Sequence, residues 1–373
     1  AKAVYGIVYG FAFLGQSSYL LVLGQTFQGI FYDFEFCLPT SVLISCGLCL
    51  PFAVSIRRLS ESVWLCFVNL LLIVLVLGIV MTAMASNGRQ QEAKTFLFAQ
   101  DLSLLTVFGS MTNVVFSYAG HWLYFEIMSE MHEPETFPRV FYINMPLQIG
   151  LYLLVACWGY YYAGDLAKGY FLDNLPNGLA YRVASVLLFA HVIVAFLIKN
   201  VVLTRYLHGL VAPSRVSTRS SEPGGARAHA EYVCCTLVLQ AACFVVANAV
   251  PFFSEFLGLV GGLLSGPISF LLPMVFYKRA LAQTPVTAAT RADASSEDLS
   301  KRPMALAPDG IEEAQQEVGK LPSADRVLFV VVGLVTVLTM VFGTYQEVLE
   351  VIANVDTIGA PFSCQLLSRN RQR

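Results

Sequence analysis

Apolar residues run along the chain in nine long segments, separated by stretches that are richer in charged residues, Gly and Pro. Each segment holds about 20 apolar residues, the length that an α-helix needs to cross roughly 30 Å of hydrocarbon. The pattern predicts an all-α polytopic membrane protein with nine spans. They are Ala3 to Phe27, Leu38 to Ile56, Val63 to Ala85, Leu104 to Met128, Val140 to Ala163, Leu179 to Leu203, Tyr232 to Phe252, Leu257 to Phe276 and Val327 to Phe342.

The fourth span carries polar groups in its middle, within the stretch Asn113 to Glu126. Each such group costs free energy in hydrocarbon, so a purely structural span would leave them out. The small residues Ala119 and Gly120 allow the helix to loosen, and irregular backbone at membrane depth survives where it lines a cavity or is buried. We therefore predict that the helix breaks around Ser117 to Gly120 and exposes backbone groups to a cavity near the midplane.

Composition agrees with a membrane protein. Hydrophobic residues make up 56% of the chain and charged residues 13%, against roughly 45 to 50% and about 25% in soluble domains. The formal net charge is −2, which gives no reason to expect nucleic acid as a partner. The lipid bilayer is the expected surroundings, and no cysteine or histidine spacing typical of a metal site occurs, so neither a metal nor a cofactor is expected.

Basic residues concentrate on the side that holds the N-terminus, where Arg57, Arg58, Arg139, Lys278 and Arg326 flank spans. The positive-inside rule makes that side cytosolic. Two segments on it, 205–231 and 278–325, are rich in Ser, Pro, Ala, Gly and mixed charge. Such composition cannot bury enough apolar surface to fold alone, so both are predicted to be disordered cytosolic linkers.

Most of the nine cysteines lie inside apolar spans and are most simply small core residues. Cys37 and Cys364 instead fall on the non-cytosolic side, where disulfides can form. Pairing also requires their α-carbons to lie within about 7 Å. The sequence leaves open whether these two cysteines pair.

Three motifs resemble one known family. Phe116-Ser-Tyr-Ala-Gly-His121 with the later Glu126 resembles the sixth helix of plant members of the amino acid/auxin permease family, within the amino acid-polyamine-organocation superfamily. His191-Val-Ile193 resembles part of the eighth helix. A third stretch resembles the family's tenth helix, with Gly258-Leu-Val-Gly261, Gly266-Pro267, Ser269-Phe270 and Pro273. The chain departs from the family pattern at Ser117, where Ala is usual, and at Lys199, where plant members are uncharged.

The resemblance implies a LeuT-like inverted-repeat helical bundle, in which broken first and sixth helices hold the substrate near the midplane. The nine spans then correspond to helices three to eleven, and we expect the first two to be absent from this sequence. Helices three to eight occupy 1–204, the linker 205–231, helices nine and ten 232–277, the loop 278–325, helix eleven 326–350, and a non-cytosolic tail 351–373.

The resemblance also implies secondary active transport of amino acids, commonly driven by protons rather than sodium, and a pocket at the central stretch. The candidate substrate-binding residues are Ser117, Tyr118, Ala119, Gly120 and His121. Each has a structural alternative: Tyr118 can be a packed aromatic, Gly120 can permit close helix packing, and His121 can be an interior histidine whose imidazole titrates near neutral pH.

Glu126, His191 and Lys199 are candidate ion-coupling residues. Glu126 lies near the membrane interface, where a structural ion pair is as reasonable as proton coupling. His191 is one polar group in an otherwise apolar span. Lys199 can be a built-in cation in place of a sodium ion, and burial would help it release a proton; alternatively it snorkels to the cytosolic headgroups near Arg205.

Two function classes remain open on the sequence. One is a transporter, and the other is an amino acid sensor of the same fold that signals through its cytosolic loops. Low-complexity linkers favour transport. No motif of a membrane enzyme occurs, so the chain is not expected to be an enzyme. The protein is expected in the plasma membrane or a vacuolar or lysosomal membrane, and the transported amino acid is not specified.

Overall fold

The computed structural model describes residues 2–57, 63–98, 102–216, 218, 223–250, 253–281, 323–358 and 361–364, and it contains no strand among them. Eight helices in these ranges are long and apolar enough to cross a membrane. A ninth apolar segment, Leu104 to Met128, is divided into two shorter helices. The predicted all-α, multi-pass membrane architecture is thus confirmed.

The helices follow the predicted spans closely, because a continuous apolar segment of this length is the main determinant of a spanning helix. Helix ends lie within a few residues of the predictions, apart from extensions into the segments 205–231 and 278–325 and at the end of the last span. The first eight α-helices are α1 (Lys2–Ile30), α2 (Leu38–Ser55), α3 (Val63–Asn87), α4 (Leu104–Ser117), α5 (His121–Glu130), α6 (Phe137–Ala163), α7 (Leu179–Val211) and α8 (Gly225–Ala249).

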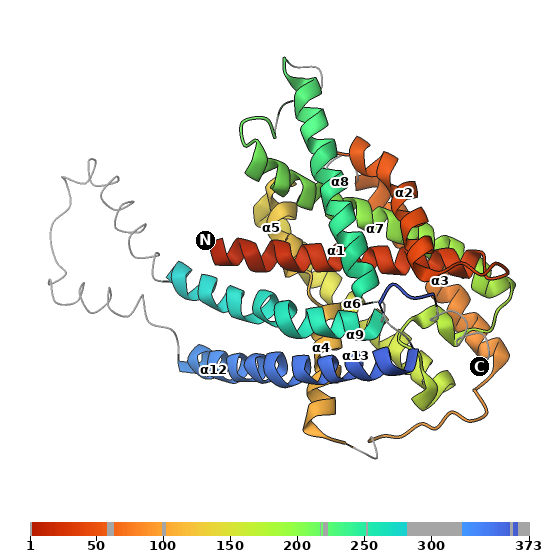
Figure 1. Cartoon of the computed structure of the whole chain (residues 1–373). Helices are drawn as coiled ribbons and strands as arrows, with labels where there is room; N and C mark the ends of the chain where they lie inside the picture. Colours follow the sequence, from red (N-terminus) through yellow and green to blue (C-terminus); the bar gives the residue numbers. More distant parts are fainter. Residues whose placement is uncertain are drawn as a thin grey trace.

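Helix α1 lies at the centre of the bundle and packs against α2, α7, α8 and the later helix α9 (Phe253–Val260) (Figure 1). Its side chains Leu20, Leu21 and Leu23 are fully buried. A Cβ added at Gly24 would lie 3.2 Å from the backbone nitrogen of Val42 in α2, so the missing side chain lets these helices approach closely, as small residues do in membrane proteins. This central position brings α1 into contact with both predicted site helices, α5 and α7.

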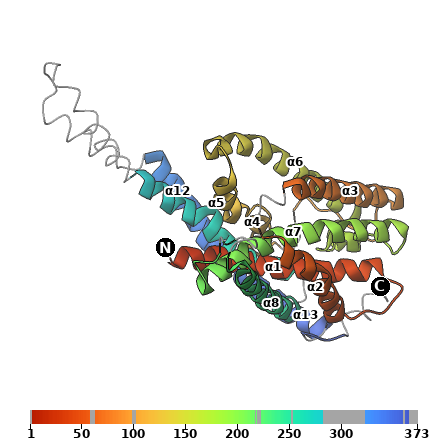
Figure 2. The ribbon, with the colours of Figure 1, turned by 90° about the horizontal axis from the view of Figure 1, so that it is seen from above.

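Large apolar side chains on α3 and α6 point away from the protein. Trp64 in α3 is 72% exposed and Leu147 in α6 is 68% exposed. Apolar surface of this extent belongs against lipid, since a soluble monomer rarely exposes it. Figure 2 shows α6 and α3 together at one edge of the bundle.

The region that follows α8 runs as one long segment, Phe253–Leu281. It consists of α9 (Phe253–Val260), the π-helical turns η5 (Gly261–Ser265) and η6 (Pro267–Leu271), and a helical part over 272–281. The next segment contains α12 (Ser323–Leu338), the π-helical turn η8 (Thr339–Gly343) and α13 (Thr344–Ile358). The two segments run side by side in both views (Figures 1 and 2).

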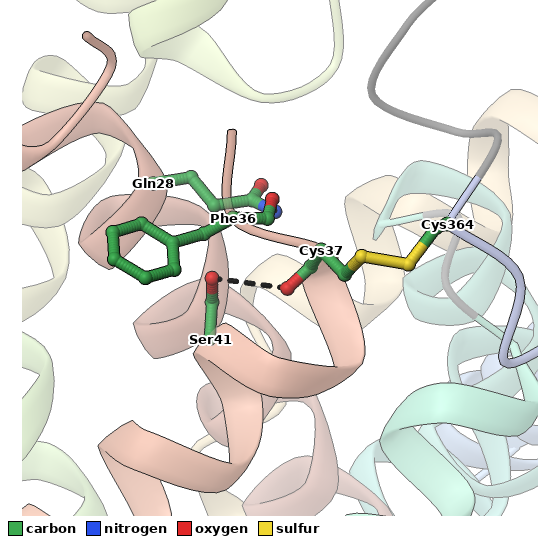
Figure 3. Close-up of a disulfide and its surroundings, with 5 residues drawn as sticks. All are labelled: Gln28, Phe36, Cys37, Ser41 and Cys364. Carbon is green, nitrogen blue, oxygen red and sulfur yellow. Dashed lines mark hydrogen bonds between the residues drawn. A yellow bond between two sulfur atoms is a disulfide. The ribbon is translucent and has the colours of Figure 1, made fainter. Parts of the chain in front are cut away.

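Cys37 and Cys364 form a disulfide, which confirms that pairing (Figure 3). Their α-carbons are 5.0 Å apart although 327 positions separate them in sequence. Cys37 is the N-cap of α2, and Ser41 in the first turn donates to its carbonyl oxygen at 3.2 Å. The bond ties the end of the described chain to the connection between α1 and α2, on the side predicted to be non-cytosolic.

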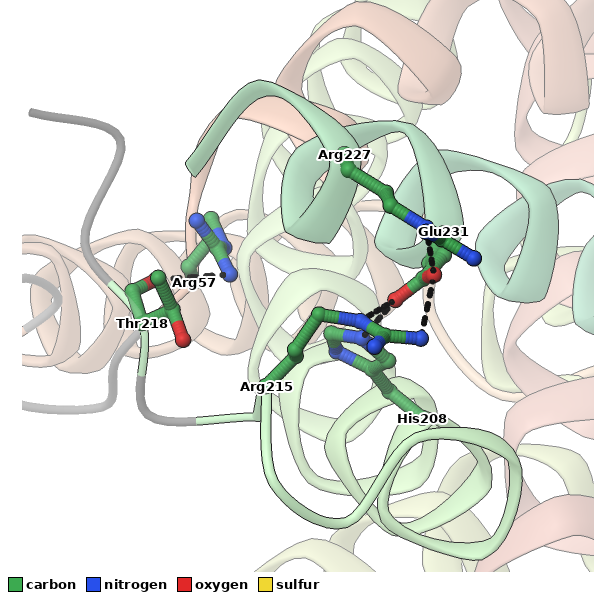
Figure 4. A network of polar contacts seen from close by, with 6 residues as sticks. All are labelled: Arg57, His208, Arg215, Thr218, Arg227 and Glu231. Atoms are coloured by element: carbon green, nitrogen blue, oxygen red, sulfur yellow. Dashed lines mark hydrogen bonds and ion pairs between the residues drawn. The ribbon is translucent and has the colours of Figure 1, made fainter. Parts of the chain in front are cut away.

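The segment 205–231 differs from the expected disordered linker at both of its ends. Helix α7 continues to Val211 and α8 already begins at Gly225. Glu231 holds the connection together, because Arg215 donates to both of its carboxylate oxygens, Nη2 to Oε1 at 2.7 Å and Nε to Oε2 at 2.8 Å (Figure 4). His208 and Arg227 add contacts of 3.4 and 3.2 Å to the same carboxylate. Arg215, Arg227 and Glu231, which contributed to the prediction of disorder, are therefore paired, whereas 217 and 219–222 lie outside the described residues.

Differences also occur around the second predicted linker, 278–325. The preceding helix reaches Leu281 and α12 starts at Ser323, while 282–322 lie outside the described residues. Helix α13 extends to Ile358, beyond the position 350 predicted for the end of the last span. The acidic residues Glu347 and Glu350 lower the hydropathy in this part of the chain, which is why the sequence indicated an end, but the helix continues through them.

Candidate functional site

The helix break predicted at the central stretch is present. Helix α4 ends at Ser117 and α5 starts at His121, so the three residues between them are not helical. Short turn bonds replace the helical pattern: the Ala119 amide donates to the Phe116 carbonyl at 3.0 Å and the Gly120 amide to the Tyr118 carbonyl at 2.8 Å. The small side chains at 119 and 120 permit this turn. It leaves two half-helix ends facing each other inside an apolar span.

The residues of the break lie among other helices of the bundle. Ala119 is buried, and Tyr118 is partly buried with its ring centroid 5.1 Å from that of Tyr152 in α6. The Tyr152 hydroxyl donates to the Ser117 carbonyl at 3.2 Å. The Ser117 hydroxyl turns back along its own helix and donates to the Asn113 carbonyl at 2.9 Å. A hydrogen bond from α6 thus supports the break, and Tyr118 packs against an aromatic ring of α6 and does not face lipid alone.

His121 begins the second half-helix. Its ring centroid lies 5.0 Å from that of Tyr124, and its Nδ1 is buried with no hydrogen-bond partner among the described residues. A buried ring nitrogen without a partner is costly unless a ligand or water supplies one. His121 is therefore the predicted pocket residue with unused hydrogen-bonding capacity.

One aromatic ring of α1 packs on both sides of the break. The Phe11 ring lies 5.9 Å from Phe116, which precedes the break, and 6.5 Å from Trp122, which follows it. All three belong to the same buried core or pack directly against it. The contact places the break against the central helix of the bundle.

Lys199 of α7 lies beside the break as well, near Phe11 and Trp122. Its side chain is 6% exposed, and its Nζ lies 4.1 Å from the ring centroid of Tyr19, 5.3 Å from Trp122 and 6.0 Å from Phe11. These distances are those of cation–π contacts. None of the ion pairs in the described part of the chain includes Lys199. The lysine points into the bundle instead of snorkelling, and its ammonium contacts the half-helix that follows the break.

Space for that ammonium comes from a glycine of α1. A Cβ at Gly15 would lie 2.4 Å from Lys199 Nζ, which is closer than any real contact. Next to it, Gln16 is fully buried, and its amide atoms have no hydrogen-bond partner within the described ranges. Neither residue could be singled out from the sequence, because Gly15 faces Lys199, which lies far away along the chain, and the amide of Gln16 has no partner among the described residues.

Glu126 and His191 lie in different settings. Tyr9 of α1 donates to Glu126 Oε1 at 3.2 Å, and the Tyr9 ring stacks on Tyr206 of α7 at 3.6 Å. Glu126 thus links α5 to α1 by a hydrogen bond, and no ion pair of the described residues includes it. His191 Nδ1 lies 3.1 Å from the Asn69 carbonyl and ties α7 to α3. That contact gives His191 a structural partner.

The tenth-helix motif acts in packing. A Cβ at Gly261 would lie 2.1 Å from the Thr112 carbonyl oxygen, and one at Gly262 would lie 2.4 Å from the Thr344 hydroxyl. The glycines therefore allow this helix to approach α4 and α13 at backbone distance. One side of helix α4, which leads to the break, is consequently packed tightly against η5.

A family model described as "Transmembrane amino acid transporter protein" matches residues 2–293. The "N amino acid transport system protein" of Neurospora crassa is 26% identical over 185 residues, covering 48% of this chain and 37% of that protein. "Amino acid transporter AVT1D" of Arabidopsis thaliana is 26% identical over 167 residues, covering 43% of this chain and 28% of that protein. "Amino acid transporter AVT1B" of the same plant is 28% identical over 174 residues, covering 46% and 30%.

The alignments span about a third of the length of these curated relatives. No solved structure gives a significant match. The matched family and the named relatives are transporters and not enzymes.

Proposed function

Because this chain belongs to the transmembrane amino acid transporter family, we propose that it moves amino acids across a membrane through a site at the break between α4 and α5. The observation that carries the proposal is the interruption at 118–120, which lies beside a buried ammonium in the middle of the bundle. A continuous helix would satisfy its own backbone groups and offer none to a substrate.

The break suits a zwitterion. The C-terminal end of α4 presents carbonyl groups with partial negative charge, and the N-terminal end of α5 presents amide groups with partial positive charge. An amino acid carries an ammonium and a carboxylate that match these ends. Tyr118 and His121 flank the turn, and the unpartnered His121 Nδ1 supplies a further hydrogen-bonding group. Ser117, Ala119 and Gly120 contribute backbone and little bulk.

The proposed architecture is the LeuT-like inverted repeat, in which a broken helix is the moving or binding part and other helices form a scaffold. What supports it is the position of the break against α1 and α7, the two helices that pack most extensively together. The proposal assigns α1 and α7 to the scaffold and α4 with α5 to the substrate site.

The proposed driving ion is the proton. Lys199 of α7 places a cation among aromatic rings of α1 and α5, so the site has no need of sodium there while the lysine is protonated. When the buried lysine loses its proton, it also loses its charge. The loss of charge would weaken its contact with Trp122 in α5. Glu126 serves as a second candidate group on α5, whereas the backbone contact of His191 supports a structural role.

Uptake of radiolabelled amino acids by the purified protein in liposomes tests the proposal. We expect uptake that rises with an inward pH gradient and does not depend on sodium. Tyr118→Ala should reduce uptake strongly, whereas Tyr142→Ala, on an 80% exposed side chain of α6, is the matched control and should not. Absence of uptake for every amino acid tested, from a correctly folded protein, contradicts the proposal.

A further inference from the structure

Glu347 of α13 is a buried carboxylate that sequence reasoning did not single out. It is 2% exposed and lies in the last long apolar segment, where a carboxylate is unexpected. Two groups of α4 donate to its Oε1 atom: the Thr112 hydroxyl at 2.9 Å and the Asn113 amide at 3.2 Å. These donors lie one turn before the helix break, so Glu347 is connected to the half-helix that ends at the proposed substrate site.

A glycine of a third element leaves the space for this carboxyl group. A Cβ at Gly258 in α9 would lie 2.1 Å from the Glu347 carboxyl carbon and 2.2 Å from its Oε1. Gly109 of α4 is also close, because its Cβ would lie 3.9 Å from Oε1. The carboxyl group therefore occupies a fitted position between α4, α9 and α13, which all pack together.

Among the residues that the structure describes, no positive charge faces Glu347. Helix α4 and the turns η5 and η8 contain no ionisable side chain. The charged groups that act on Glu347 are Glu255 of α9 and Glu350 of its own helix, both of the same sign; Tyr345 on α13 is 54% exposed. No ion pair in the described ranges includes Glu347. A buried charge without a cation is costly, and one proton removes that cost.

The hydrogen bonds around Glu347 can satisfy either protonation state. The Thr112 hydroxyl has one hydrogen to donate, and its oxygen lies 2.9 Å from Glu347 Oε1 and 2.6 Å from the Gly109 carbonyl. With Glu347 charged, that hydrogen points to the carboxylate. With Glu347 protonated, the new carboxyl hydrogen can be donated to Thr112 while Thr112 donates to Gly109. In both arrangements Thr112 and Glu347 Oε1 stay hydrogen-bonded to each other, and the direction of that hydrogen bond reverses.

We propose that Glu347 is a proton-binding site that couples proton uptake to movement of the α4 half-helix, a proposal that rests on the transport function given above. A proton from the aqueous phase binds the carboxylate and forms the neutral acid. Bonds to a charged acceptor are about twice as strong as neutral ones, so protonation weakens the hold of α13 on α4. Release of the proton restores the stronger hydrogen bonds from Thr112 and Asn113 of α4 to the charged Glu347. Because α4 ends at the break, each step alters the position of the substrate site.

The test uses liposomes that contain the purified protein and a clamped membrane potential. An inward gradient of about one pH unit should drive about tenfold accumulation of substrate at one proton per substrate. Glu347→Gln keeps the volume and an accepting oxygen but cannot titrate. We expect it to lose accumulation while it still exchanges labelled for unlabelled substrate across the membrane. Glu92→Gln, an exposed carboxyl group in the α3–α4 connection, is the control and should accumulate normally.

A second variant keeps the inference testable even when Glu347→Gln does not fold. Thr112→Val removes one donor to the charged form and preserves side-chain shape. It should shift the pH of half-maximal uptake upward by about one unit, because the charged state loses a hydrogen bond. Accumulation by folded Glu347→Gln equal to wild type, or an unshifted profile in Thr112→Val, overturns the inference alone. A wild-type protein that transports no amino acid overturns the proposed function with it.

Discussion

Lys199 lies beside the break although it belongs to a different helix, α7. Its ammonium lies between rings of α1 and α5 with no carboxylate partner among the described residues. Replacing Lys199 by Ala removes this charge and should abolish pH-driven uptake while leaving the protein inserted and monodisperse. Lys94→Ala, an exposed lysine in the connection after α3, should behave as wild type. The measurement is uptake across a pH series; normal transport with an unchanged pH profile would show that Lys199 has no coupling role.

Gly15 gives an independent test of the same contact. A methyl group there would lie 2.4 Å from Lys199 Nζ, so Gly15→Ala must displace the ammonium from its aromatic surroundings. We expect uptake to fall about as far as in Lys199→Ala. Gly6 lies in the same helix with nothing within 4 Å of its Cβ position, and Gly6→Ala should retain uptake. Equal activity of the two glycine variants would indicate that the ammonium position does not matter.

At the scale of elements, hydropathy predicted the positions of all nine apolar segments, since length and composition decide whether a helix can span a bilayer. The break in the fourth was also predicted, from the polar residues and small side chains at 117–121. Partners of single polar residues were not predictable: Glu347 and Thr112 are 235 positions apart. The same holds for Tyr9 and Glu126, at 117 positions. Such contacts depend on how the helices pack, which a single sequence does not show.

The close approach of α4 to the segment after α9 depends on Gly261. A Cβ there would lie 2.1 Å from the Thr112 carbonyl oxygen, and backbone cannot yield as a flexible side chain does. Gly261→Ala should therefore destabilise the bundle by about 1 to 3 kcal/mol, the usual cost of overpacking. Gly333→Ala in α12, where nothing lies within 4 Å, is the control. Thermal unfolding in detergent measures both, and equal melting temperatures would contradict the packing role.

At the scale of the whole molecule, the disulfide joins the end of the described chain to the start of α2. It closes a loop of 327 positions, and removing a disulfide typically costs about 2 to 4 kcal/mol. Cys37→Ser should lower the melting temperature clearly, whereas Cys66→Ser, at an exposed free cysteine, should not. In the unreduced protein neither Cys37 nor Cys364 should react with a maleimide; labelling of either thiol would show that the bond is absent.

The central claim is that amino acids and protons cross together at the break. Its most direct test records substrate and proton entry in the same sodium-free liposomes, with a pH-sensitive dye trapped inside and a labelled amino acid outside. The account predicts that adding substrate acidifies the interior in proportion to the amino acid taken up. It also predicts that Lys199→Ala and Glu347→Gln remove the acidification. Substrate entry with no change of internal pH in the wild-type protein would contradict the account.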